Sequence, residues 1–388
     1  MDIKNISNKY KDYVIEKRRY FHMNPEPSFC EFNTSKVIKE ELDKLSIPYI
    51  VSAETGIIAT IKGKENGKTV LLRADMDALE VCEKNEVSYK SQKDGLMHAC
   101  GHDGHVAMLL GAAHILNEIK EEIKGEIKLL FQPAEEIATG AKKMIEETNI
   151  TDQIDSAFAI HLWQGVPVGK VSLESGARMA AADMFKIKIK GKSGHGSMPH
   201  ETVDAALTAA AVLMNLQHLV SRNTNPLDTL VITIGKMEAG TRFNVIAGEA
   251  VLEGTARSFS KEVWEKIPEQ LERVINSTCD AYGATAEIEL NRATPPLVND
   301  EKISEILKNS VEKLYGAEAV TKYEKTPGGE DFAYFTQKVP GALAFVGIRN
   351  DEKGIDAPHH NEKFDMDERG LEIGTNLYVQ FALDFLNS

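Results

Sequence analysis

Three histidines, a cysteine and an aspartate fall within eight residues, His98-Ala-Cys-Gly-His-Asp-Gly-His105, directly before the apolar stretch 106–113. Thiolate and imidazole ligands suit zinc, or manganese, cobalt or nickel, depending on the remaining ligands. A structural zinc site would need a second Cys/His pair of similar spacing, but the other three cysteines stand alone. The cluster therefore predicts an open, catalytic metal site. The sequence also predicts Asp103 as the N-cap of the helix that follows. The alternative to a metal site is this N-capped helix with histidines that bind nothing.

Length and charge limit the remaining possibilities. A chain of 388 residues is too long for one compact core, so two domains are expected. A formal net charge of -14 argues against a nucleic-acid partner. The N-terminal residues lack the apolar core of a signal peptide, and no stretch approaches the ~20 apolar residues of a membrane span. Four cysteines without paired spacing indicate reduced thiols, and a cytoplasmic protein without a membrane partner is expected.

Acidic residues and a histidine follow three predicted strands of the N-terminal half. Asp75 and Asp77 follow the apolar strand 68–74, Glu135 and Glu136 follow strand 125–131, and His161 follows strand 155–160. The carboxyl ends of such strands are where α/β proteins bind ligands, so these residues should share one site with Cys100 and His102. Neighbouring residues on a regular strand point to opposite faces. Both glutamates therefore reach one cleft only if the backbone after Pro133 is irregular.

The middle of the chain has a different pattern, which indicates an inserted domain. The predicted order is strand 183–191, helix 202–221, strands 229–239 and 246–258, helix 261–281 and strand 284–291. This βαββαβ string is typical of a ferredoxin-like sandwich. Pro268 should kink the second helix, unless the helix boundary is wrong. The predicted domains are a discontinuous catalytic domain, 1–182 and 296–388, and an insertion, 183–295.

Several motifs, in one order, resemble the metal-dependent amidohydrolases that include aminoacylases, hippurate hydrolases, indole-acetyl-amino-acid hydrolases and carboxypeptidase G. The match is most similar to the hippurate and indole-acetyl-amino-acid hydrolase branch, which uses a cysteine and a histidine from the 98–105 loop. The stretches that carry the resemblance are 72–79, 98–105, 131–136, 159–162, 191–196, 328–332 and 359–365.

The resemblance implies an α/β fold, with an exopeptidase-like catalytic domain built on a mixed sheet and a lid or dimerisation insertion. It also implies a site with two divalent ions (Mn, Zn, Co or Ni). Its ligands would be Cys100, His102, Glu136, His161 and His360, with His359 as the alternative to His360. Glu135 would be the general base and acid, Asp77 would support the site from behind, and Gly329 would contact substrate. Glu362 stands where the family has proline, which leaves the path of that loop open.

The same residues can be read as chemistry. Two metal ions about 3.5–4 Å apart lower the pKa of water toward ~7, and Glu135 would take its proton and pass it to the leaving nitrogen. His195 could donate a hydrogen bond to the oxyanion, although an isolated loop histidine is more often simply solvated. Asn244 and Arg257 could hold the free carboxylate of a substrate; a loop cap and a surface charge are the alternatives.

The resulting prediction is a cytoplasmic homodimer, associated through the insertion, that hydrolyses N-acyl amino acids. A metallo-carboxypeptidase or dipeptidase is the nearest alternative. A di-metal phosphoesterase is disfavoured because few Lys and Arg residues lie near the motifs. A non-catalytic metal-binding scaffold is disfavoured because it has no use for Glu135 beside the ligand Glu136.

Overall fold

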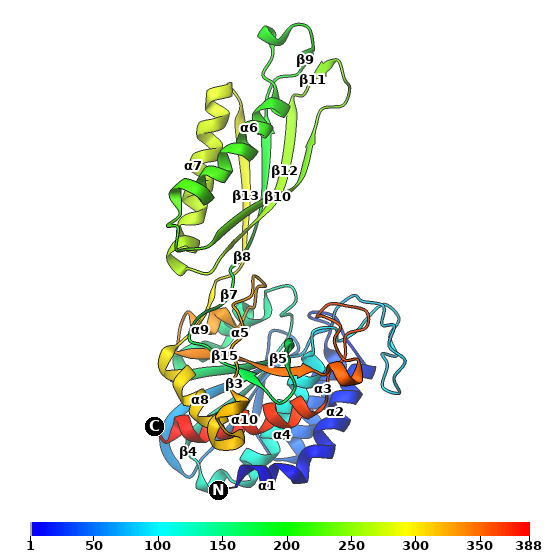
Figure 1. Cartoon of the computed structure of the whole chain (residues 1–388), viewed down its shortest axis with the longest axis vertical. Coiled ribbons are helices and arrows are strands. Elements are labelled where there is room, and N and C mark those ends of the chain that lie inside the picture. Colours follow the sequence, from blue (N-terminus) through cyan, green and yellow to red (C-terminus); the bar gives the residue numbers. More distant parts are fainter. Residues whose placement is uncertain (1) are drawn as a thin grey trace. The chain divides into compact units, whose positions relative to one another are not determined.

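The computed structural model describes residues 2–388, which divide into two compact units (Figure 1). The first unit consists of the chain up to Arg178, Val298–Glu324 and Asp331–Ser388. The second unit consists of Met179–Leu297 and Lys325–Glu330. The segment Lys325–Glu330, which contains Gly329, thus belongs to the second unit, whereas the sequence-based division placed it with 296–388.

The first unit is built on a mixed seven-stranded sheet. Its central four strands run parallel and its edge strands are antiparallel. In spatial order the strands are β1 (Tyr49–Ser52), β2 (Gly56–Lys62), β4 (Lys124–Gln132), β3 (Glu65–Asp75), β5 (Ser156–Pro167), β15 (Gly341–Arg349) and β6 (Val171–Ser172).

Helices cover both faces of this sheet, which explains its sequence. Val70, Leu71 and Leu72 are consecutive in β3 and all fully buried, as in a strand covered on two sides. On one side lie α4 (His102–Glu118), α8 (Glu301–Tyr315) and α10 (Arg369–Leu386), and on the other α5 (Gly140–Thr148) and α9 (Ala333–Thr336) (Figure 1). The N-terminal helices α1 (Ile3–Ser7), α2 (Lys11–Met23) and α3 (Phe32–Lys44) pack on α4.

Helix α4 begins earlier than the sequence predicts, and the prediction of Asp103 as its N-cap is wrong. The helix begins at His102, after Gly101, whose φ of 91° is the left-handed conformation that glycine tolerates. Asp103 lies in the first turn with its side chain fully buried, where it accepts hydrogen bonds from Arg18 and His22. The two cations of α2 hold this carboxylate inside the protein, so it is not available to cap backbone groups.

The second unit has the predicted element order. It contains β8 (Ala182–Lys190), α6 (Ala205–His218), β10 (Leu230–Ala239), β12 (Glu249–Ser258), α7 (Lys261–Tyr282) and β13 (Thr285–Thr294). The four strands form an antiparallel sheet in the order β10-β12-β8-β13. Both helices pack on one face, where they bury the alternate residues Phe185, Ile187 and Ile189 of β8. The remaining short strand pairs are β9 (Gly194–His195) with β11 (Val245–Ile246), and β7 (Gly176–Met179) with β14 (Leu297–Asn299).

Helix α7 runs without interruption through Pro268, so the predicted helix boundaries are close to the observed ones. Proline lacks an N–H and cannot bond the carbonyl four residues earlier, which here belongs to Trp264. A strand residue supplies the missing donor, because Arg292 Nη2 donates to the Trp264 carbonyl at 2.7 Å. The Arg292 guanidinium also lies 3.5 Å from the Trp264 ring centroid. Among the described residues, no helix combines the length and the apolar character needed to span a membrane.

Candidate metal centre

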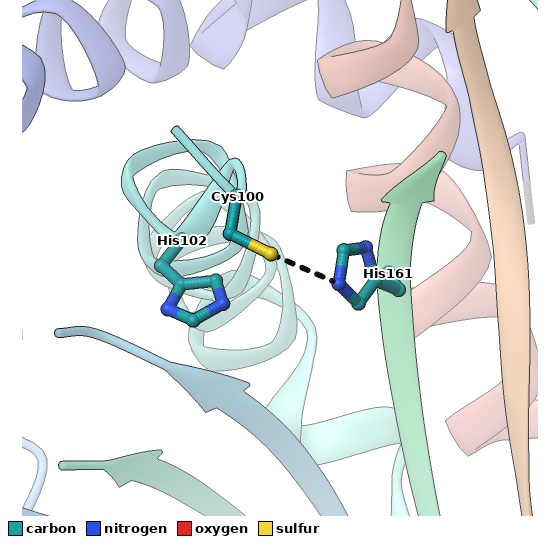
Figure 2. A group of neighbouring side chains, drawn as sticks. All are labelled: Cys100, His102 and His161. Carbon is teal, nitrogen blue, oxygen red and sulfur yellow. Dashed lines mark hydrogen bonds between the residues drawn. The ribbon is translucent and has the colours of Figure 1, made fainter. Parts of the chain in front are cut away.

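Four segments of the first unit bring Cys, His and Glu side chains together. Cys100 and His102 come from the start of α4, Glu135 and Glu136 from the turn after β4, His161 from β5, and His360 from the segment before α10. Figure 2 shows Cys100 directed at His161, with Sγ 3.6 Å from Nε2, and His102 beside them. On the other side of the cluster, Glu136 Oε2 lies 3.6 Å from His360 Nε2. The ligand atoms of Cys100, His102 and His161 lie within 4.8 Å of one another, and so do those of Cys100, Glu136 and His360.

His161 lies inside its strand, whereas the sequence placed it at the strand end. β5 continues to Pro167 because β15 pairs with it beyond this point, with Phe345 opposite His161. On its other side β5 pairs with β3 only as far as Arg73 opposite Ala159. His161 lies two residues beyond the last β5 residue that pairs with β3, so its side chain is in the region where the candidate ligands gather.

An irregular turn brings both glutamates to the same site, as the sequence requires. Ala134 has a φ of 53°, which is unusual for a residue with a Cβ and is held here by a hydrogen bond from its N–H to Glu31 Oε1 at 3.0 Å. After this residue, the backbone N–H groups of Glu135 and Glu136 both donate to the carboxylate of Asp77, each at 3.1 Å. Asp77 thereby holds the backbone of both glutamates from behind the cluster.

Hydrogen bonds orient two of the histidines so that Nε2 faces the cluster. His102 Nδ1 lies 2.9 Å from the Asp77 carbonyl, and His161 Nδ1 lies 2.9 Å from the Leu162 carbonyl. A ring whose Nδ1–H donates to a carbonyl carries a lone pair on Nε2, the atom left to bind a metal. His102 Nε2 and Glu136 Oε1 are buried without a hydrogen-bond partner. Buried polar atoms are normally satisfied, and here a bound cation would satisfy both.

The electrostatics of the cluster also favour a cation. Burial, together with Asp77 and Asp75, raises the pKa of Glu136 to about 7. Burial opposes a charge on His102, but Asp75, Asp77 and Glu136 raise its pKa to about 10. Burial and the nearby carboxylates raise the pKa of the Cys100 thiol. A divalent ion would stabilise the carboxylates and thiolate together, and the sulfur, nitrogen and oxygen donors fit zinc, cobalt, nickel or manganese.

The structure separates the two histidines that the sequence left as alternatives. His359 Nε2 donates to the Leu162 carbonyl at 3.0 Å, and its ring lies 4.6 Å from that of Trp163. His360 has a φ of 64° and is directed at Glu136. Both ring nitrogens of His105 are also hydrogen-bonded. Its Nδ1 lies 2.5 Å from Asp75 Oδ1, and its Nε2 accepts a hydrogen bond from the Leu162 N–H at 2.8 Å.

The predicted substrate residues of the second unit fall into two groups. His195 on β9 and Asn244 lie together, because the Gly196 N–H donates to the Asn244 carbonyl at 3.0 Å and β9 pairs with β11. Arg257 lies near the start of β8, where Nη1 donates to the Asp183 carbonyl at 3.4 Å. A Cβ on Gly329 would come within 3.0 Å of Ala182, so Gly329 lies at the same end as Arg257.

The first group lies in the β9–β11 pair, beyond the end of the four-stranded sheet (Figure 1), and the second lies at the opposite end, where β8 begins. The residue pairs Lys190–Glu249 and Asp183–Ala256 mark the two ends of the β8–β12 ladder. At about 3.3 Å per residue, the ends are about 23 Å apart. In one copy of this unit, Asn244 and Arg257 are therefore too far apart to hold one small carboxylate together.

Sequence reasoning missed several residues that hold the cluster in place. Glu31 fixes Ala134, Ser28 Oγ donates to Asp77 at 2.7 Å, and Arg18 bonds Asp103. Each lies far from the ligands in the chain. Of these three residues, only Ser28 lies in a stretch that the sequence marks as a loop, next to Pro25 and Pro27.

Cysteine, histidine and carboxylate side chains gathered near the carboxyl ends of parallel strands form a site of the kind at which metal ions activate water for hydrolysis. The sequence profile of Peptidase family M20/M25/M40 matches residues 71–384, and the chain belongs to this family. The prediction of a metal-dependent amidohydrolase is confirmed by this membership and by the relatives below.

The similar proteins cover nearly the whole chain. Thermostable carboxypeptidase 2 of Saccharolobus solfataricus is 40% identical, over 99% of this chain and 98% of the relative. IAA-amino acid hydrolase ILR1-like 4 of Arabidopsis thaliana is 37% identical, over 98% of this chain and 87% of the relative. Among solved structures, YXEP of Bacillus subtilis, described as a dinuclear metal binding peptidase, has a TM-score of 0.85 at 34% identity, covering 98% of this chain and 99% of that chain.

Proposed function

We propose that the chain hydrolyses the amide bond of N-acyl amino acids at a centre of two divalent metal ions. The observation that carries this proposal is the pair Glu135 and Glu136 on the turn held by Asp77. The five proposed ligands can hold metal ions without Glu135, so the Glu135 carboxylate is available for another role. Its Oε2 lies 4.0 Å from His102 Nε2, a position that suits proton transfer. The Arabidopsis relative, named for hydrolysis of an amino-acid conjugate, supports this substrate class.

The proposed ligands are Cys100, His102, Glu136, His161 and His360. When bound, two divalent ions supply Lewis acidity that polarises the amide carbonyl and makes water acidic; the donor set suits Zn, Co, Ni or Mn. Glu135 accepts the proton of the attacking water and donates it to the leaving nitrogen, which departs as an amine. Asp77 keeps Glu135 and Glu136 in place through their backbone N–H groups.

His195 is proposed to stabilise the oxyanion. The Ser197 N–H donates to His195 Nδ1 at 3.1 Å, which leaves the proton of the neutral ring on Nε2. The side chain is exposed, so Nε2–H is free to donate to a developing negative charge. Arg257 and Gly329, at the other end of the sheet, are proposed to contact the substrate carboxylate.

The second unit is proposed to be a ferredoxin-like lid that also forms a homodimer. Its βαββαβ order and antiparallel sheet support the fold assignment. Its outer helix positions Leu207 and Met214 are exposed, which suits an interface between copies. The four cysteines are free thiols, which supports a reducing, cytoplasmic location.

Metal removal and a substrate panel test this function. Chelation should abolish amine release from N-acyl amino acids, and adding back zinc, cobalt, nickel or manganese should restore it. The panel also contains dipeptides and C-terminally blocked peptides, because a relative is named as a carboxypeptidase. Faster release of C-terminal residues from peptides than of acyl groups from amino acids would favour the carboxypeptidase. Full activity of the metal-free protein would contradict the proposal.

A further inference from the structure

One buried guanidinium connects two of the segments that carry the proposed ligands. The side chain of Arg18, on α2, is completely buried. Its Nε donates to Asp103 Oδ2 at 2.9 Å, and its Nη2 donates to Asp365 Oδ1 at 3.0 Å. Asp103 directly follows His102, and Asp365 follows His360 five positions later. The planar guanidinium thus spans carboxylates next to two ligands that are far apart in the chain.

Each of the two carboxylates is held by a further group. His22 Nδ1 lies 2.8 Å from Asp103 Oδ2, and Tyr89 Oη donates to Asp365 Oδ2 at 2.9 Å. The ring of Tyr89 also lies 4.7 Å from Arg18 Cζ. Burial opposes the charge on Arg18, but Asp103 and Asp365 raise its pKa, so the guanidinium stays charged. A charged, planar group with several fixed partners has one orientation, which a flexible ammonium group would not reproduce.

We propose that Arg18 is a positioning residue that fixes the His102 and His360 segments at the separation that metal binding requires. This inference rests on the proposed metal centre. Arg18 does not contact the ligand atoms; it acts through Asp103 and Asp365. Partners behind metal ligands commonly contribute about 10–100-fold to metal affinity. The left-handed backbone at His360 adds to the argument, because a strained conformation persists only where its surroundings hold it.

A purely structural ion pair is the competing explanation, and metal affinity distinguishes the two. A structural role lowers the stability of the protein but leaves the affinity of each folded molecule unchanged. A positioning role lowers affinity in protein that is still folded. The adjacent Arg19 provides a matched control, because it bonds Glu368 with Nε and Nη2 at 2.8 and 2.7 Å and bonds neither Asp103 nor Asp365. Arg18 Nη1 also reaches Glu368, at 3.5 Å, so Arg19→Lys tests this shared partner separately from the two carboxylates next to the ligands.

The experiment titrates the metal-free full chain with Co²⁺ alone and follows its visible absorption, with thermal unfolding of the same metal-free samples measured in parallel. Arg18→Lys and Asp365→Asn should remain folded at the titration temperature and bind Co²⁺ about 10–100-fold more weakly than wild type. Arg19→Lys should bind like wild type. If Arg18→Lys does not fold, Asp365→Asn decides, because it preserves the buried Arg18–Asp103 pair.

Wild-type Co²⁺ affinity in folded Asp365→Asn and Arg18→Lys would overturn the positioning role. Equal weakening in Arg19→Lys would also overturn it, because the effect would then belong to the helix as a whole. Absence of Co²⁺ binding in wild type would overturn the metal centre itself, an outcome that the wild-type titration identifies separately.

Discussion

At the scale of single residues, adjacent side chains of one type have different surroundings. Glu136 faces His360 and His102, and one of its oxygens has no hydrogen-bond partner. Both glutamates lie at similar distances from His102 Nε2, 3.8 Å for Glu136 and 4.0 Å for Glu135, and the contact with His360 is the one that distinguishes Glu136. The left-handed Ala134 before them makes this arrangement possible, because on a regular strand they would face opposite ways.

This difference predicts separable effects of two conservative substitutions. Glu135→Gln should keep the metal content of wild type and reduce kcat by ~10²–10⁴-fold, because it removes the acid–base group. Glu136→Gln should lower metal affinity, because it removes a ligand. Elemental analysis of dialysed protein and initial rates of amine release measure both effects. If metal content fell in Glu135→Gln and not in Glu136→Gln, the two roles would be exchanged.

The proposed ligands could be predicted from the sequence because their types and spacing carry the chemistry directly. Cys100 and His102 share one motif, and Glu136 and His161 follow apolar strands. Arg18 and Glu31 could not be predicted, because a charged residue becomes buried only through contacts made elsewhere in the chain. Asp103 was misassigned for the same reason: its spacing fits a cap, but Arg18 and His22 draw it inward.

At the scale of elements, α7 shows how a local rule can be broken by a distant residue. Proline in a helix normally costs about 3 kcal/mol or more. Arg292 on β13 offsets part of this cost by bonding the carbonyl of Trp264 that Pro268 leaves without a helical donor. The sequence marks Pro268 as a helix breaker, and only the fold of the second unit shows the residue that compensates.

A double-mutant cycle tests this compensation. Arg292→Met should destabilise the protein by about 1–3 kcal/mol, because the Trp264 carbonyl loses its donor. In the Pro268→Ala background the same substitution should cost less, because the introduced alanine supplies a backbone N–H to that carbonyl. Urea unfolding of all four proteins gives the coupling free energy. Equal costs of Arg292→Met in both backgrounds would show that Arg292 acts through its other contacts, such as the stacking on Trp264 and the ion pair with Asp183, and not through this hydrogen bond.

At the scale of the whole molecule, the two groups of predicted substrate residues in the second unit set a geometric limit. His195, in the β9–β11 pair, lies beyond one end of the four-stranded sheet, and Arg257 lies at its other end. The seven steps of the β8–β12 ladder alone separate them by about 23 Å at about 3.3 Å per residue. A single small substrate cannot contact both in one copy of the chain. If both residues act in the reaction, they come from different copies.

Mixing two inactive variants tests this requirement. His195→Ala should keep its metal and lose about 10²–10³-fold in kcat, the usual effect of removing an oxyanion donor. After exchange of subunits with Glu135→Gln, a random mixture should regain about a quarter of the wild-type rate, since half of the dimers are mixed and each has one complete site. As a control, mixing Glu135→Gln with a variant that carries both Glu135→Gln and His195→Ala should restore no activity. No recovery, despite mixed dimers seen by native mass spectrometry, would place His195 in its own chain's site.

The element order of the second unit and three central strands of the first could be predicted from the sequence because hydrophobic periodicity is a local signal. The assignment of 325–330 to the second unit could not, because this segment is short and has no periodicity of its own. The separation of Asn244 from Arg257 also follows from strand register, which no single stretch of sequence encodes.

The position of β15 between β5 and β6 also has a consequence for biosynthesis. About 170 residues, including all of the second unit, are translated between β6 and β15. At roughly 5–20 residues per second, the ribosome needs about 10–30 s for this stretch. During that interval β5 has an unpaired edge, the kind of strand that pairs wrongly with other chains. His360 emerges later still, so a nascent chain acquires its complete set of proposed ligands only when translation is almost finished.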